Sequence, residues 1–98
     1  MHVVTATVSM KTKPDQVEAM KQVAIELVDF CQKEEGCRLY YFQQSQADPT
    51  HFLLYMQWID QARFEKHLKN PLVQKFDTEQ AELLLAEPFQ VTHWTMVS

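Results

Sequence analysis

One histidine stands where the sequence could carry out acid–base chemistry. Residues 60–71 read Asp-Gln-Ala-Arg-Phe-Glu-Lys-His-Leu-Lys-Asn-Pro, in which Asp60 can cap a helix and Pro71 forces the residue before it out of the α region. Phe64 and His67 lie three residues apart, so the imidazole falls on the apolar face of this short helix. Because an imidazole titrates near neutral pH, His67 is the predicted catalytic residue of an apolar pocket. It would equally fit a structural role, hydrogen-bonded to a nearby backbone carbonyl.

The segment before this helix provides the predicted pocket walls. Residues 51–59 are rich in Leu, Tyr and Trp, as in a strand, and Trp58 near its end could stack on a flat aromatic ligand. Met56 would make the pocket drier, and Phe64 would add a second aromatic wall. Tyr41, on the preceding strand, could hold a ligand oxygen. These side chains would also fit the hydrophobic core or, for Tyr41, an interface between subunits.

The elements that must position these residues follow the order β-α-β-β-α-β. Strands are expected over residues 4–10, 37–46, 51–59 and 89–96, and helices over residues 14–34, 60–70 and 71–86, the last with a break near Asp77. Gly36, the only glycine, follows the first helix and is expected to have a left-handed backbone. This order is typical of the ferredoxin-like split βαβ fold, an α+β fold with a four-stranded antiparallel sheet. The 98 residues are expected to form a single domain, 1–98.

Both faces of the predicted sheet carry large apolar side chains. The strands contain Tyr40, Phe42, Leu53, Tyr55, Trp94 and Met96 beside Leu39, Tyr41, Leu54, Trp58 and Val91. Helices on one side of the sheet can cover only one of its faces. At roughly 25 cal/mol per Å² of apolar area, exposure of the other face to water would be unfavourable. A homodimer packed sheet against sheet is therefore expected.

Composition excludes several classes of partner. The net charge of −4 and the absence of a basic stripe argue against nucleic-acid binding. Cys31 and Cys37 are not at metal-ligand spacing, so free thiols are expected and no metal site. The apolar runs are too short to span a bilayer, and the N-terminus has no signal-peptide pattern. A cytoplasmic protein is expected.

Three segments, in this order, resemble the antibiotic biosynthesis monooxygenase (ABM) family, particularly its small bacterial quinol-monooxygenase-like members. They are Lys33-Glu-Glu-Gly-Cys37, Phe52-Leu-Leu-Tyr-Met-Gln-Trp58 and Phe64-Glu-Lys-His-Leu-Lys-Asn-Pro71, and the resemblance covers essentially the entire chain. It implies a dimer in which two ferredoxin-like sheets form an α/β barrel, with a pocket between each sheet and its helices. Family members include oxygenases that use no metal or organic cofactor, haem-degrading enzymes and an isomerase.

Two departures from the family pattern concern this pocket. The family's strand glutamate, two residues before the tryptophan, is Met56 here, which removes a potential acid or base. The hydroxyl residue before the family's proline is Asn70. The haem-degrading branch has an asparagine where this chain has Thr7, and a haem-ligating histidine after the proline, whereas this chain has no histidine between residues 68 and 92. Haem degradation is therefore not expected.

The resemblance and the residue pattern together predict a homodimeric monooxygenase that oxidises a small quinol-like or phenolic aromatic with O2, without cofactor or metal. His67 would be the base, and the predicted substrate-binding residues are Trp58, Met56, Phe64, Phe76, Tyr41 and Thr7. A non-catalytic module that binds a small ligand on the same scaffold is an alternative, because Met56 replaces the glutamate. An isomerase or hydrolase that uses His67 on a small carbonyl compound, as in one branch of the family, is a third possibility.

Overall fold

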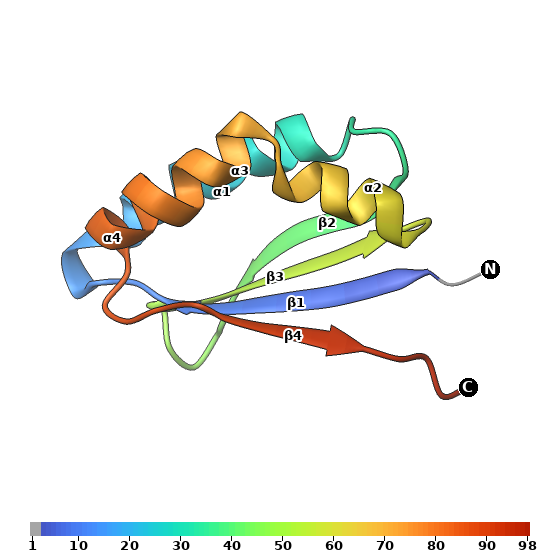
Figure 1. Cartoon of the computed structure of the whole chain (residues 1–98). Helices are drawn as coiled ribbons and strands as arrows, with labels where there is room; N and C mark the ends of the chain where they lie inside the picture. The colour runs from blue at the N-terminus through green and yellow to red at the C-terminus, as the bar shows by residue number, and fades with distance from the viewer. Residues whose placement is uncertain (1–2) are drawn as a thin grey trace.

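The computed structural model describes residues 3–98 and has one antiparallel sheet with all helices on one face (Figure 1). The elements are β1 (Val4–Lys11), η1 (Pro14–Gln16), α1 (Val17–Cys31), β2 (Cys37–Gln44), β3 (His51–Trp58), α2 (Gln61–Leu68), α3 (Pro71–Lys75), η2 (Phe76–Gln80), α4 (Ala81–Leu84) and β4 (Gln90–Trp94). The strands follow the order β2-β3-β1-β4, and each neighbouring pair is antiparallel. The predicted α+β ferredoxin-like fold is confirmed. No helix among the described residues is long and apolar enough to cross a membrane.

Alternation along β1 separates the two faces of the sheet. Ala6, Val8 and Met10 are buried beneath the helices, whereas Thr5 and Thr7 point to the other face and are only half-buried. The register carries this division across the sheet, because residues paired between neighbouring strands share a face. The hydrophobic core therefore lies between one face of the sheet and the helices.

The first long helix ends earlier than predicted. The α1 helix stops at Cys31, and the amide of Glu34 then bonds the carbonyl of Cys31 in a tight turn. Gly36 follows with φ of +84°, the left-handed backbone expected of it. Its carbonyl accepts a hydrogen bond from the amide of Ile59, 2.9 Å away, so the end of α1 lies beside the start of α2.

Side-chain caps divide the second helical region. The amide of Arg63 donates to Asp60 Oδ1 over 2.9 Å, which confirms the predicted cap of α2. Asn70 caps α3 in the same way, since its Oδ1 accepts from the amide of Leu72 over 2.9 Å. The break expected near Asp77 is the π-helical turn η2. The last strand is shorter than predicted.

The tight approach of α2 to Gly36 generates a first prediction. A Cβ atom at this position would lie 2.7 Å from the Cβ of Arg63, and it would also meet Arg63 Cγ. Replacing Gly36 by Ala is expected to lower the free energy of unfolding by about 1–2 kcal/mol or more, because the left-handed backbone alone costs that much for a residue with a Cβ. Denaturant unfolding monitored by circular dichroism measures the change.

Gly36→Asn is the matched comparison. Asparagine tolerates a left-handed backbone better than alanine but carries the same Cβ. Since the contact with Arg63 remains, we expect Gly36→Asn to be destabilised as well, although less than Gly36→Ala. An asparagine variant as stable as the wild type would show that the close approach to Arg63 is unimportant.

Candidate functional site

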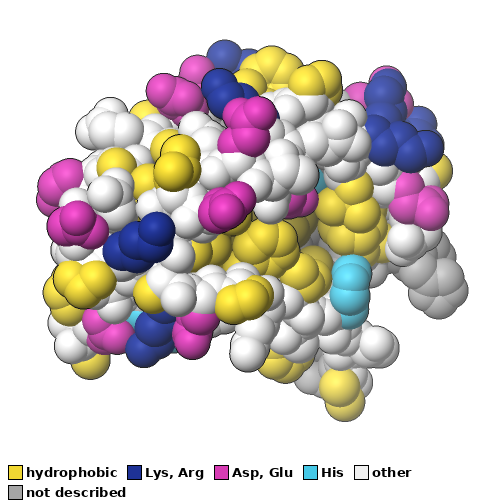
Figure 2. Space-filling view, turned by 60° about the vertical axis from the view of Figure 1, so that its left-hand side comes forward, with side chains coloured by type: hydrophobic (Ala, Val, Ile, Leu, Met, Phe, Trp, Pro, Cys, Tyr) yellow, Lys and Arg dark blue, Asp and Glu magenta, His cyan; other side chains and the backbone are white. Residues whose placement is uncertain are grey.

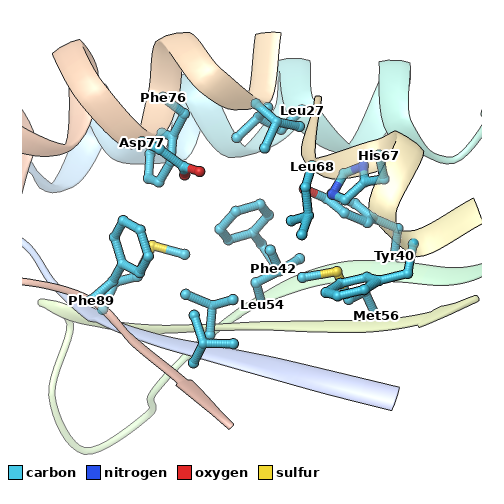
Figure 3. Close-up of a pocket in the computed structure, with 15 residues that line it drawn as sticks. Leu27, Tyr40, Phe42, Leu54, Met56, His67, Leu68, Phe76, Asp77 and Phe89 are labelled. Carbon is cyan, nitrogen blue, oxygen red and sulfur yellow. The ribbon is translucent and has the colours of Figure 1, made fainter. Parts of the chain in front are cut away.

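A small apolar cavity lies between the covered face of the sheet and the helices α2, α3 and η2 (Figure 3). Its volume is about 70 Å³. The space-filling view shows apolar side chains at the floor of a hollow with acidic side chains above it (Figure 2). Most lining residues are apolar, and the polar ones are Tyr40, His67 and Asp77.

His67 is buried at one end of this cavity, with 2% of its surface exposed. Its Nδ1 lies 2.7 Å from Oε1 of Glu34, a residue of the turn that follows α1. Because an ionised carboxylate can only accept, Nδ1–H donates this hydrogen bond. In the neutral ring, Nε2 is then the unprotonated nitrogen, and no hydrogen bond among the described residues involves it.

Two aromatic rings hold the imidazole in place. The ring of Trp58 lies 4.5 Å from that of His67 between centroids, and the ring of Tyr40 meets it edge-on at 5.3 Å. Trp58 is fully buried and its indole N–H has no hydrogen-bond partner among the described residues. Trp58 therefore packs behind His67 and does not line the cavity, whereas its sequence position predicted a place in the pocket wall.

The structure brings some predicted site residues together and separates others. Met56, Phe64 and Phe76 line the cavity with His67. Tyr41 and Thr7 lie on the other face of the sheet, where the Thr7 hydroxyl accepts a hydrogen bond from the Trp94 indole over 2.9 Å. The sheet therefore separates these two residues from the cavity. The sequence shows that Tyr41 and Thr7 alternate with residues of the opposite face. It does not show which of the two faces the helices cover.

Three polar residues near or in the cavity were missed by the sequence analysis. Glu34 belongs to the Glu-Glu-Gly-Cys segment, but nothing in the sequence pairs it with a histidine 33 residues away. Tyr40 was predicted only to be one of the large apolar side chains on the sheet. Asp77 was marked only as a break in a helix. The one usable signal was that break, since π-helical turns are frequent at functional sites.

The groups behind His67 keep their protons. Burial, reinforced by the charge of Glu34, raises the pKa of the Cys31 thiol to about 12. Burial also raises the pKa of the Tyr40 hydroxyl, and the neighbouring Cys31 adds to this shift. At the other end of the cavity, Asp77 is an exposed residue, but the part of its carboxyl that faces the cavity is partly buried, which raises its pKa, while the charge of His67 opposes that shift.

One group of residues could hold a metal ion. Ligand atoms of Cys31, Glu34 and His67 all lie within 4.8 Å of one another. In the structure, however, Glu34 and His67 bond each other, and the pKa of the Cys31 thiol lies well above neutral pH. Binding of an ion here would require the Cys31 thiol to lose its proton and the Glu34–His67 hydrogen bond to break.

The family model described as antibiotic biosynthesis monooxygenase matches residues 1–79. The chain belongs to the ABM family. PA3566 from Pseudomonas aeruginosa has a similar structure, with TM-score 0.90 and 23% identity, covering 100% of this chain and 97% of that one. Rv0793 from Mycobacterium tuberculosis is also similar, with TM-score 0.90, 20% identity and coverage of 99% and 97%. A structure described as antibiotic biosynthesis monooxygenase has TM-score 0.88, 20% identity and coverage of 97% and 99%.

At these identities the structures support the shared fold only. A search of curated proteins finds no match to the sequence. The ABM match supports a monooxygenase in general terms, and the substrate has to be inferred from the cavity itself.

The protonated, buried thiol generates a second prediction. Cys31 is fully buried and Cys37 half-buried, and both thiol pKa values are raised, chiefly by burial. We expect iodoacetamide at pH 8 to leave Cys31 unmodified in the folded protein, because the thiolate is the reactive species. Mass spectrometry of the Cys37→Ser variant, which retains only Cys31, measures this directly.

The Cys31→Ser variant, which retains only Cys37, provides the comparison. It should be labelled faster than the Cys37→Ser variant under native conditions, and the two should react alike in denaturant. Rapid native labelling of Cys31 would contradict the buried arrangement behind His67.

Proposed function

We propose that this ABM protein is a monooxygenase without cofactor or metal that oxidises a small quinol-like or phenolic aromatic with O2. The observation that carries the proposal is the Glu34–His67 pair, bonded over 2.7 Å at the end of an apolar cavity. His67 acts as the general base through Nε2, and Glu34 fixes the tautomer that leaves this nitrogen unprotonated. Met56, Phe64 and Phe76 form apolar walls around the ligand.

The reaction needs only the substrate as reductant. Nε2 of His67 takes a phenolic proton, and the resulting anion passes one electron to O2. The two radicals combine to form a carbon–oxygen bond, and the protonated imidazole returns its proton to the resulting peroxide anion. The hydroperoxide then loses water as the ring becomes oxidised. For hydroquinone the products are hydroxybenzoquinone and one water molecule, so one oxygen atom enters the ring and the other leaves as water.

The size of the cavity limits the substrate. A cavity of about 150 Å³ holds benzene in another protein, whereas this cavity measures about 70 Å³. A single aromatic ring therefore enters only if side chains at the opening move. Leu68 lines the cavity and is 43% exposed, so it is free to turn outward. Polycyclic substrates fit the cavity poorly.

A second candidate function is binding without catalysis. Met56 stands where the family pattern has a glutamate, and it lines the cavity. A cavity with fewer acid–base groups can bind an apolar ligand without transforming it. Hydroquinones tested for both oxygen consumption and thermal stabilisation distinguish the two functions, since stabilisation without oxygen consumption identifies a binding protein.

We also propose that the protein is a cytoplasmic homodimer that packs sheet against sheet. The open face of the sheet carries Leu53 and Tyr55, both half-buried, beside Tyr41 and Trp94, which are 48% and 56% exposed. Apolar area of this kind favours association. The free thiols Cys31 and Cys37 suit a reducing compartment.

The proposed base generates a third prediction. His67→Ala should lower kcat for an accepted hydroquinone by about 100-fold or more, because general base catalysis typically contributes that much. Glu34→Gln should lower kcat by about 10-fold, since it removes a charge-assisted hydrogen bond. Oxygen-electrode measurements on folded variants, checked by circular dichroism, give both values.

His51→Ala is the control for loss of a histidine. His51 bonds the Ser9 hydroxyl over 2.8 Å and does not line the cavity, so its loss should leave turnover near the wild-type value. Unchanged turnover in folded His67→Ala would rule out the assigned role.

The open sheet face generates a fourth prediction. Leu53→Arg should convert the dimer to a monomer, because it places a charge in the middle of the proposed interface. Multi-angle light scattering after size-exclusion chromatography measures the mass. Ile25→Arg is the control, since Ile25 is an exposed residue of α1 on the helical side. A wild-type monomer, or a dimeric Leu53→Arg variant, would contradict this interface.

A further inference from the structure

The cavity has a second ionisable group opposite His67. Asp77, on η2, is an exposed residue at the rim of the cavity, and its carboxylate points towards the space lined by Phe42, Leu54 and Phe89 (Figure 3). None of the ion pairs among residues 3–98 involves this carboxylate. Asp77 also lines two shallow surface hollows, so it stands where the cavity meets the solvent.

This carboxylate belongs to the π-helical turn η2. The amide of Ala81 bonds the carbonyl of Phe76, five residues earlier, which makes the turn wider than an α-helical one. Phe76 and Asp77, the first two residues of this turn, both line the cavity. Phe76 is buried and packs near Phe89, with ring centroids 6.5 Å apart. The turn thus places one apolar and one charged side chain at the same end of the cavity.

The surroundings of Asp77 are acidic. Glu82 and Glu87 line one of the hollows at its side, and Glu79 lines the other together with Lys75. Acidic side chains stand above the apolar floor in the space-filling view (Figure 2). A ligand that enters here with a negative charge meets repulsion, whereas a hydrogen-bond donor or a cation meets an acceptor.

The polar groups at the two ends of the cavity, His67 and Asp77, indicate which class of ligand fits it. We propose that Asp77 is a specificity-determining residue that accepts a hydrogen bond from the far end of the substrate, while His67 faces the near end. The ligand class is a single aromatic ring with a hydroxyl at one end and a hydroxyl or amino group at the opposite end, and aromatic anions are excluded. The role of the near end depends on the proposed function, but the role of Asp77 does not.

Binding measured without oxygen tests this proposal separately from catalysis. The probes are hydroquinone, 4-aminophenol, phenol and 4-hydroxybenzoate, titrated calorimetrically into the anaerobic wild-type protein. Hydroquinone and 4-aminophenol should bind about 10-fold more tightly than phenol, since each adds a hydrogen bond to a charged acceptor. The anion 4-hydroxybenzoate should bind most weakly.

Asp77→Asn and Glu79→Gln form the matched pair of variants. Each removes one carboxylate from η2, but only Asp77 lines the cavity. Asp77→Asn should bring hydroquinone and 4-aminophenol to within about 3-fold of phenol and strengthen binding of 4-hydroxybenzoate. Glu79→Gln should preserve the wild-type order of affinities.

The outcomes separate the two proposals. Equal affinities for hydroquinone and phenol in the wild type, or identical preferences in both variants, would overturn the role of Asp77. Failure of every probe to bind would overturn it as well. Full ligand discrimination without oxygen consumption would support Asp77 while contradicting the proposed monooxygenase.

Discussion

The hydrogen bond between Glu34 and His67 is the contact on which the geometry of the cavity depends. It joins the turn after α1 to α2 over 2.7 Å, in a place where His67 is almost fully buried. A buried imidazole without a partner would be costly, so the turn and the helix must stay in register. The left-handed Gly36 makes this possible, because its carbonyl bonds Ile59 immediately before α2 begins. Backbone conformation at a single residue thus controls where the proposed base lies.

Trp58, on the sheet side of the imidazole, limits the orientation of the Glu34–His67 pair. Its ring lies 4.5 Å from that of His67, so the imidazole cannot turn towards the sheet without displacing a fully buried indole. The Tyr40 ring limits movement from the side at 5.3 Å. Since the neighbouring thiol and phenol keep their protons, Glu34 is the carboxylate that balances the imidazole when it gains a proton. A rigid, partnered imidazole beside an apolar cavity follows from these contacts.

Local patterns in the sequence were sufficient to predict the fold. Alternation along β1, the caps at Asp60 and the glycine at position 36 are each encoded within a few residues. The site depended on contacts between distant residues, and these were not predictable. Glu34 and His67 are 33 residues apart, and the face occupied by Tyr41 depends on which side the helices pack. Asp77 required knowledge of a π-helical turn, which has no strong sequence pattern.

The position of Asp77 also bears on the loss of the family's strand glutamate. With Met56 at this position, the sheet wall of the cavity has no carboxylate. The carboxylate bonded to His67 is Glu34, from the turn after α1. A carboxylate remains in the cavity, but on the helical wall opposite the imidazole (Figure 3). A carboxylate in this position contacts the end of the ligand that His67 does not reach, and so it orients a substrate rather than exchanging protons with the base.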